Sequence, residues 1–305
     1  MVQHLAKVQS TANVYFRTQN SDWSGIYIGL ADRVPVVELV TNQKLGLPIA
    51  MGSRSIIHEW GPNSVAKVPK DSTPEGWMRF EASYTAALHK CGAPVPEVFG
   101  IALINGREAS IMERIHGPSM WEAMIDSPGE VASFGRQLGD LHLQLLAIRP
   151  PILLPSQRSR LACKIRHAAR SVDNGILHAL DLIPPCRPIS LCHGDFHPKN
   201  VLLSSTGPVV VDWFDVSRGD ALGDVARTSL LLGGHHADSE AAHLPGAAPL
   251  LLSELHDTYL LSVLTGLGAT TPQLGDWRIV EAAARIAEDV DQQALLNLLR
   301  SANIL

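Results

Sequence analysis

One short segment constrains this chain more than any other part of it. The run His-Gly-Asp-Phe-His-Pro-Lys-Asn places Asp195 and Asn200 five positions apart. Two apolar runs follow, 201–203 and 209–211, with five polar or turn-forming residues between them, and Asp212 comes directly after the second run. Apolar runs of this length around such a turn predict a β-hairpin. The hairpin would bring the polar side chains at its two ends close together.

The pairing register of this hairpin can be predicted. If Leu203 faces Val209 in an antiparallel pair, constant register sets Asn200 opposite Asp212. An amide oxygen and a carboxylate would then meet at one point. That pair suits Mg²⁺, which usually takes one or two protein oxygen ligands and completes its shell with water and phosphate oxygens. Asp195, in the loop before the hairpin, is placed to accept a hydrogen bond from an attacking hydroxyl and orient it toward a terminal phosphate.

The pattern H-G-D-x-x-x-x-N, followed by an apolar hairpin and Asp, resembles the catalytic segment of aminoglycoside phosphotransferases, choline kinases and related kinase-like enzymes. The continuation from 212 to 226 resembles the same family's D-W-x-x-x-x-x-G-D-P-x-x-D-x-A run, with Ala221 where proline is usual. The resemblance implies that Asp195 is the catalytic base and that Asn200 and Asp212 hold magnesium. An ordinary hairpin with two incidental acids is the weaker interpretation.

The resemblance also implies the fold class: a two-lobed, protein-kinase-like α+β fold with a small, mostly β N-lobe and a larger, mostly α C-lobe. We expect residues 47–116 to form the nucleotide-binding N-lobe. Residues 117–305 would form the C-lobe, which carries the catalytic loop, the metal site and the acceptor-binding surface. Residues 1–46 would be an N-terminal extension, and they match no recognisable motif.

A nucleotide-binding lysine is expected on a strand before the first helix. Val65-Ala66-Lys67 resembles the V-A-I-K lysine strand of kinases, and Lys70 is a nearby competitor. On the following helix Glu81 falls within the arc of an apolar stripe, so its carboxylate would point at the core. An unpaired buried carboxylate costs several kcal/mol, roughly, so a lysine from the neighbouring strand is the expected partner. We therefore predict that Lys67 pairs with Glu81.

Two further nucleotide contacts are expected from position in the chain. A phosphate-covering loop should precede the lysine strand, where Gly52, Ser53 and Ser55 offer backbone amides and small hydroxyls, although G-x-G-x-x-G is absent and a plain strand-to-turn junction is an equal alternative. The segment 111–117 resembles the connection between lobes. Its backbone between Glu113 and Ile115 would hydrogen-bond an adenine edge.

The polar residues around the central motif have mostly structural interpretations. We expect His193 and His197 to brace the loop through backbone hydrogen bonds, because no further Cys or His stands at metal-ligand spacing. Asp224 is expected to cap a helix beginning near Val225, and the resemblance implies that it also holds the catalytic loop in place. Asp215 is expected to be a surface or supporting residue.

The coarse secondary structure follows from periodicity and turn signals. Strand pairs are predicted on either side of Gly61-Pro62-Asn63 and of Asn105-Gly106, which is the strongest short hairpin signal. Ser127 with Pro128 predicts a capping box and the start of a long core helix. The remaining elements are helical runs, predicted at 74–91, 158–180, 250–266 and 277–299.

Composition limits the classes of function. The net charge of −5 is spread without long like-charged blocks, so no nucleic-acid partner is expected. The four cysteines stand in no C-x-x-C spacing, and no stretch is long and apolar enough to cross a membrane, so we expect reduced thiols in a cytoplasmic protein without a membrane segment.

The predicted function is that of a small-molecule kinase. It would use ATP and Mg²⁺ to phosphorylate a hydroxyl of an antibiotic such as an aminoglycoside, with a role in antibiotic resistance, or of an amino-alcohol or sugar metabolite. A protein kinase fits less well, because the loop has H-G-D in place of H-R-D and no A-P-E segment follows. A pseudokinase or nucleotide-binding regulatory module without turnover is the alternative, because the glycine loop is degenerate.

Overall fold

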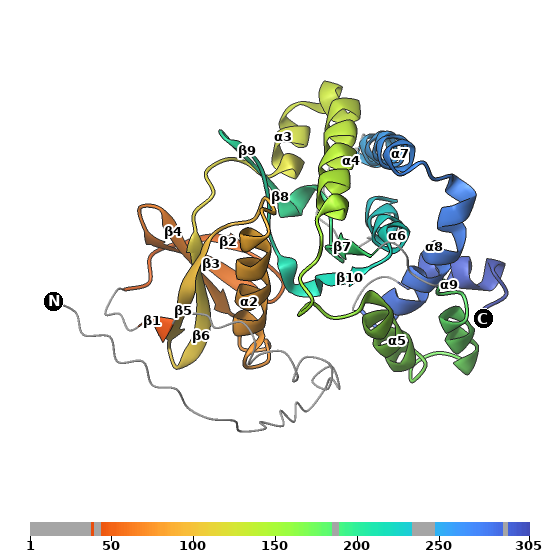
Figure 1. Ribbon diagram of the computed structural model, residues 1–305, viewed down its shortest axis with the longest axis horizontal. Coiled ribbons are helices and arrows are strands. Elements are labelled where there is room, and N and C mark those ends of the chain that lie inside the picture. The colour runs from red at the N-terminus through yellow and green to blue at the C-terminus, as the bar shows by residue number, and fades with distance from the viewer. Residues whose placement is uncertain (1–37, 40–43, 185–188, 234–247, 289–291) are drawn as a thin grey trace.

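The computed structural model describes residues 38–39, 44–184, 189–233, 248–288 and 292–305. Most of the expected N-terminal extension, 1–46, lies outside the described residues. So do Cys186 and the segment 234–247. The described chain forms a β-rich part followed by a mostly helical part, and this is the two-lobed α+β fold that the sequence predicts (Figure 1).

The β-rich part is a six-stranded sheet in the order β1-β5-β6-β4-β3-β2. Neighbouring strands are antiparallel except for β1, which pairs with β5 in parallel. The central strand β4 carries the predicted lysine between two hydrogen-bonded neighbours. The strands are β1 (Glu38–Leu39), β2 (Pro48–Met51), β3 (Ser55–Gly61), β4 (Ser64–Pro69), β5 (Val98–Ile104) and β6 (Arg107–Glu113).

Both hairpins predicted for this sheet are confirmed. β3 and β4 pair across the turn after Gly61, and β5 and β6 pair across Asn105 and Gly106. Those two residues have φ values of 52° and 78°, and a two-residue turn with positive φ at both positions matches the twist of the strands that it joins.

Helix α2 (Trp77–Lys90) packs against β5 and β6 of the sheet. It begins later than the predicted residue 74, because Gly76 before it adopts a left-handed conformation with φ of 80°. The apolar stripe of α2, formed by Phe80, Tyr84 and Leu88, belongs to the same buried core as the C-terminal helices. This helix therefore joins the sheet to the helical part.

The helical part is built mainly from two packed pairs, α4 with α7 and α6 with α8 (Figure 1). Two small antiparallel sheets, β7 with β10 and β8 with β9, lie between these helices and the large sheet. The helices are α3 (Met120–Asp126), α4 (Val131–Ala147), α5 (Gln157–Ala168), α6 (Ala221–Leu232), α7 (Ala248–Leu267), α8 (Thr271–Arg285) and α9 (Gln293–Ser301). The short strands and 3₁₀ turns are β7 (Ser190–Cys192), β8 (Val201–Ser204), β9 (Gly207–Val210), β10 (Ser217–Gly219), η1 (Pro128–Glu130), η2 (Asn174–Leu180), η3 (Pro198–Asn200) and η4 (Trp213–Asp215).

The helical predictions are confirmed in kind and corrected in detail. The run 158–180 is divided into α5 and η2, and the run 277–299 contains the end of α8 and most of α9. The predicted capping box at Ser127 is wrong, because its side chain makes no cap hydrogen bond and Pro128–Glu130 forms a 3₁₀ turn. The capping boxes of the described chain begin at Ser119 and Thr270. Within the described residues no helix has the length and apolar character needed to cross a membrane.

Candidate active site

The central hairpin forms where the sequence predicts it, but with a register shifted by one residue. Ser204 pairs with Gly207, so the loop contains two residues, and Leu202 faces Val209 in place of Leu203. The cause is the tight turn, in which Ser204 Oγ donates a hydrogen bond to the carbonyl oxygen of Gly207 over 2.7 Å.

The two ends of the hairpin still lie side by side. Val211 lies opposite Asn200, and its N–H donates to the Asn200 carbonyl oxygen over 2.9 Å. The predicted pairing of Asn200 with Asp212 is therefore wrong by one residue. Asp212 follows with φ of 66° and ψ of 60°, a left-handed conformation that turns the chain out of the strand. The two predicted magnesium ligands are thus carried by the two ends of one hairpin.

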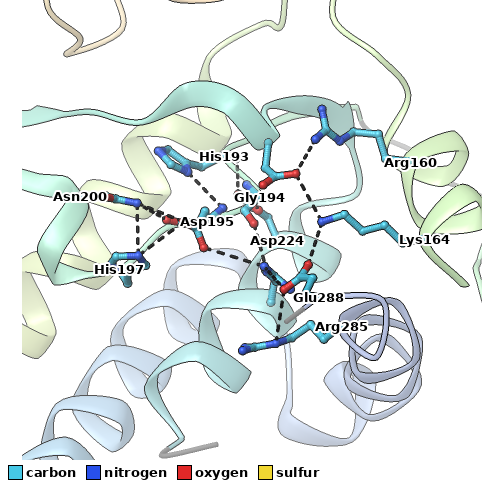
Figure 2. Close-up of polar contacts among 12 residues, drawn as sticks. Arg160, Lys164, His193, Gly194, Asp195, His197, Asn200, Asp224, Arg285 and Glu288 are labelled. Carbon is cyan, nitrogen blue, oxygen red and sulfur yellow. Dashed lines mark hydrogen bonds and ion pairs between the residues drawn. The ribbon is translucent and has the colours of Figure 1, made fainter. Parts of the chain in front are cut away.

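Asp195 and Asn200 are in direct contact (Figure 2). The Asn200 side-chain nitrogen donates to the Asp195 carbonyl oxygen over 2.9 Å and lies 3.4 Å from Asp195 Oδ2. His197 Nε2 lies 3.2 Å from the same nitrogen and 3.5 Å from Asp195 Oδ2. Because these contacts hold the amide nitrogen, the Asn200 amide oxygen is the end turned away from Asp195, and it accepts no hydrogen bond within the described part of the chain.

The surroundings of Asp195 keep its carboxylate ionised. Burial alone would raise the pKa of Asp195, but His197 and Arg227 outweigh burial and hold the pKa well below its usual range. The Asp195 side chain is 31 % exposed, so an incoming hydroxyl can reach it. An ionised, reachable carboxylate is a hydrogen-bond acceptor, which is what a group that orients a hydroxyl must be.

The predicted ion pair of Lys67 with Glu81 is confirmed. Lys67 Nζ on β4 lies 2.6 Å from Glu81 Oε1 on α2, and both side chains are buried. The same nitrogen donates to Asp212 Oδ1 over 3.0 Å. Burial alone would lower the pKa of Lys67, but the carboxylates of Asp212 and Glu81 raise it above its usual range, so the ammonium keeps its charge. Lys67 thus joins the sheet, α2 and the hairpin at one point.

The loop that carries Asp195 is held from beneath by Asp224. The two carboxylate oxygens of Asp224 accept hydrogen bonds from the backbone N–H groups of Gly194 over 2.8 Å and His193 over 2.7 Å. His142 Nε2 approaches the same carboxylate to 3.1 Å. The predicted cap at Asp224 is wrong, because α6 begins earlier and Asp220 caps it by accepting from the Leu222 N–H.

His193 braces the same loop with both ring nitrogens. Its Nδ1 accepts from the Asp195 N–H over 3.1 Å, and its Nε2 lies 3.1 Å from the Val211 carbonyl oxygen. These partners require the neutral ring with the proton on Nε2, and burial accordingly lowers the pKa of His193. Bracing by this histidine is therefore confirmed.

Gly194 makes the tight turn of this loop possible. Its φ is 81°, and a Cβ atom at this position would lie 2.4 Å from the carbonyl oxygen of Asp215. No other residue type fits both the backbone conformation and the space. The glycine before Asp195 is therefore required by the packing of the loop on η4.

The predicted phosphate-covering residues form a turn between β2 and β3. The Gly52 N–H donates to the Ser55 carbonyl oxygen over 2.9 Å. Gly52 and Ser53 are exposed, whereas Ser55 is buried at the start of β3. Arg54, at the tip of this turn, lies over the stacked rings of Trp77 and Phe214, about 5 Å from each ring centre. The turn is thus fixed to α2 and to the segment that follows Asp212.

The connection between the two parts is fastened to the hairpin. The Glu113 N–H donates to the Glu97 carbonyl oxygen over 2.8 Å, whereas Ile115 makes no backbone hydrogen bond within the described residues. Farther along, the Leu203 N–H donates to the Pro118 carbonyl oxygen over 2.8 Å, and a Cβ atom on Gly117 would lie 1.9 Å from the Leu203 carbonyl oxygen. Among the backbone N–H groups from Glu113 to Ile115, that of Ile115 is the one without a backbone partner in the described residues.

A network of charged side chains beside Asp195 was not predicted from the sequence. Arg227 Nη2 lies 3.9 Å from Asp195 Oδ1 and 2.9 Å from Glu288 Oε2, while its Nε donates to the Gly194 carbonyl oxygen over 3.1 Å. The sequence did contain a signal for the position of Arg227. It lies one helical turn after Asp224 on α6 and so falls on the same helix face, which is turned toward the loop of Asp195. The partner residues come from distant helices, and no local pattern places them here.

Comparison with known proteins gives one family and a common fold. Residues 57–248 match the model of a family described as the phosphotransferase enzyme family. No curated protein sequence matches the chain.

Three solved structures illustrate the common fold. An aminoglycoside-3'-phosphotransferase of type VIII is 20 % identical, with a TM-score of 0.57 and coverage of 80 % of this chain and 94 % of that one. The choline kinase of Cryptosporidium parvum Iowa II is 14 % identical, with a TM-score of 0.51 and coverage of 86 % of this chain and 91 % of that one. The streptomycin–ATP ternary complex of APH(2'')-IIa is 15 % identical, with a TM-score of 0.50 and coverage of 86 % of this chain and 91 % of that one.

Proposed function

The chain belongs to the phosphotransferase enzyme family, and we propose that it transfers the γ-phosphoryl group of ATP to a hydroxyl of a small molecule. The observation that carries the proposal is the convergence of four side chains from distant parts of the sequence. Lys67 contacts Asp212 over 3.0 Å, Asn200 contacts Asp195, and one hairpin joins the two pairs. We take residues 47–116 as the nucleotide-binding lobe and 117–305 as the lobe that carries the catalytic loop and binds the acceptor.

The proposed nucleotide side of the site is formed by Lys67, Asp212 and Asn200. The Lys67 ammonium, held by Glu81, would bind phosphate oxygens, and the backbone of Ile115 would meet the adenine edge. Gly52 and Ser53 would lie over the phosphates. One solved structure of the same fold is a complex with ATP, and this supports ATP as the nucleotide of the proposed reaction.

The donor atoms present fit a magnesium ion. The Asp212 side chain is 48 % exposed, and the Asn200 amide is fixed by its nitrogen so that its oxygen is the available end. A carboxylate and an amide oxygen are hard ligands of the kind that Mg²⁺ takes alongside phosphate oxygens. Asn200 and Asp212 would hold the ion, which when bound neutralises charge on the phosphate oxygens.

The chemical step rests on Asp195. Its carboxylate would accept a hydrogen bond from the acceptor hydroxyl, aim the oxygen at the terminal phosphorus, and take the proton as the new P–O bond forms and the bond to ADP breaks. Asp224, His193 and Gly194 keep the loop in the conformation that presents this carboxylate. Positioning and electrostatics would supply most of the rate acceleration.

ADP release with a panel of acceptors tests this function. The purified protein is incubated with Mg-ATP and, in turn, aminoglycosides, macrolides, choline-like amines and sugars, and the variant Asp195→Ala is run beside it. We expect acceptor-dependent ADP release that the variant lacks. If ATP raises the melting temperature but no acceptor gives turnover above the variant, the alternative of a regulatory nucleotide-binding module is correct.

A further inference from the structure

The two carboxylate oxygens of Asp195 face different surroundings. Oδ2 lies 3.4 Å from the Asn200 nitrogen and 3.5 Å from His197 Nε2 (Figure 2). Oδ1 lies 3.9 Å from Arg227 Nη2. Under the proposed function the phosphates lie on the side of Asn200. An in-line transfer needs the acceptor hydroxyl on the side opposite the leaving group. The acceptor therefore approaches Asp195 across the surface that Oδ1 faces.

That surface is a continuous chain of ion pairs, here called the ionic chain, made of Asp215, Lys164, Glu288 and Arg227. Lys164 Nζ lies 3.3 Å from Asp215 Oδ1 and 2.9 Å from Glu288 Oε1. Arg227 Nη2 lies 2.9 Å from Glu288 Oε2. The four side chains come from η4, α5, the residues just after α8, and α6, so tertiary packing alone assembles them. In Figure 2 its members Lys164 and Glu288 lie on the other side of Asp195 from Asn200.

Each carboxylate of the ionic chain already has at least two cationic partners. Asp215 contacts Arg160 as well as Lys164, and Glu288 contacts Lys164, Arg227 and Arg285. Burial alone would raise the pKa of Glu288, but Arg227 and Lys164 lower it to about 2. An ammonium group arriving here meets neutralised acids and the cations that already contact them. A polycationic acceptor would have to displace those cations or be repelled by them.

The ionic chain can still bind uncharged polar groups. The side chains of Lys164, Asp215 and Glu288 are 15 %, 17 % and 21 % exposed, so a ligand can reach their edges. Along the chain hydrogen-bond acceptors alternate with donors. A hydroxyl group both donates and accepts, so neighbouring hydroxyls on one molecule match this alternation without adding charge.

The pocket behind the ionic chain has spare hydrogen-bonding capacity. Its lining includes Gly194, Arg227 and Glu281. Arg227 Nη1 is buried without a hydrogen-bond partner. This unused donor beside the catalytic loop suits the oxygen of a hydroxyl group, which accepts hydrogen bonds.

From this arrangement we propose that the phosphoryl acceptor is an uncharged, hydroxyl-rich molecule of the sugar or polyol class and not a polycationic aminoglycoside. The inference rests on the proposed function and specifies its acceptor. Glu288 and Lys164 would hydrogen-bond hydroxyls next to the one that Asp195 orients. The network thereby selects the acceptor by hydrogen bonding instead of by charge.

The first test compares acceptors in the ADP-release assay. The uncharged set is myo-inositol, glucose, N-acetylglucosamine and uridine, and the cationic set is kanamycin and streptomycin. We expect kcat/KM at least about 100-fold higher for the best uncharged acceptor. Equal or better turnover of an aminoglycoside overturns this inference and leaves the proposed function standing. Turnover with no acceptor of any kind overturns both.

The second test asks for a gain of binding. In Lys164→Met the cation that bridges Asp215 and Glu288 is removed, so each of these carboxylates loses one positively charged neighbour. Kanamycin binding, measured by titration calorimetry, should tighten about tenfold relative to the wild type. The control is Arg166→Met, an exposed position on the same helix α5, which should bind kanamycin as the wild type does. Unchanged or weaker kanamycin binding in Lys164→Met contradicts the inference.

Discussion

Lys67 on β4 and Glu81 on α2 form a buried ion pair with 2.6 Å between nitrogen and oxygen. The pair ties the sheet to the helix, and the contact of the same ammonium with Asp212 extends the tie to the hairpin.

The pair should show strong coupling in a double-mutant cycle of Lys67→Met, Glu81→Leu and the double variant. Lys67→Met leaves the Glu81 carboxylate buried without its cation and should cost about 3–5 kcal/mol of unfolding free energy. Glu81→Leu should cost less, because Asp212 still neutralises Lys67. Urea unfolding measures all three. Additivity of the single changes to within about 0.5 kcal/mol would show that the pair contributes no coupling.

Removal of the proposed base should separate chemistry from binding. Asp195→Ala should lower kcat by about 10²- to 10⁴-fold, because no group remains to orient and deprotonate the hydroxyl. ATP affinity, measured by calorimetry, should stay close to that of the wild type, since Asp195 lies off the phosphate side. Asp126→Ala, at an exposed position at the end of α3, is the control and should change neither quantity. Near-normal turnover of Asp195→Ala would refute the assignment of the base.

Asp212 should control the magnesium dependence of nucleotide binding. In the wild type we expect Mg²⁺ to tighten ATP binding, because the ion links the Asp212 carboxylate to the phosphates. In Asp212→Ala the ratio of ATP dissociation constants without and with Mg²⁺ should fall toward one. Calorimetry with and without a chelator gives that ratio. A ratio equal to that of the wild type would exclude Asp212 as a ligand.

Glu281 should make stability fall as pH rises. Burial raises the pKa of Glu281 to about 7, from 4.5. Between these values the folded protein keeps a proton that the unfolded chain has lost, so the wild type loses stability with rising pH and Glu281→Gln does not. The unfolding free energy of Glu281→Gln relative to the wild type should therefore grow by up to about 3 kcal/mol between pH 5 and pH 8.

Glu288 provides the matched contrast, because its pKa is lowered, to about 2. Its stabilising contribution is present above pH 4.5 and is lost as the pH falls toward 2. The difference between Glu288→Gln and the wild type should thus be constant from pH 5 to pH 8 and shrink below that window. The same pH trend in both variants would contradict the assigned directions.

Gly194→Ala should destabilise the catalytic loop. The added Cβ would meet the Asp215 carbonyl oxygen, and the backbone there has φ of 81°. Strain at such a position costs about 1–3 kcal/mol, and the clash adds to it. Gly129→Ala is the control, because a Cβ atom there would have no neighbour within 4 Å and its φ is not positive. Equal urea midpoints for the two variants would show that Gly194 is not required.

The local elements of the fold could be predicted because short-range chemistry determines them. Asn105 and Gly106 favour the left-handed turn that β5 and β6 need, and the buried position of Glu81 in an apolar stripe was enough to predict its pairing with Lys67. The hairpin before Asp212 was predicted in kind but not in register. Hydrogen bonds of the Ser204 hydroxyl to Thr206 and Gly207 stabilise the two-residue loop there, and two loop lengths were compatible with the same apolar pattern.

The part of the site that escaped prediction depends on packing between distant helices. Lys164 and Glu288 are 124 positions apart, and their ion pair exists only because α5 packs against α8. No periodicity within either helix carries that information. The residues that resemble the family's motif were therefore found from the sequence, whereas the surface expected to select the acceptor was not.

The hydrogen bond from Leu203 to Pro118, together with the backbone contact at Gly117, has a mechanical consequence. Strand β8, which directly follows the proposed metal ligand Asn200, cannot move away from the connection at 117–118 without breaking that bond. Under the proposed function, the opening that releases ADP would therefore bend the chain on the sheet side of Gly117. Product release would then move the large sheet, while the helical part and the hairpin keep their arrangement.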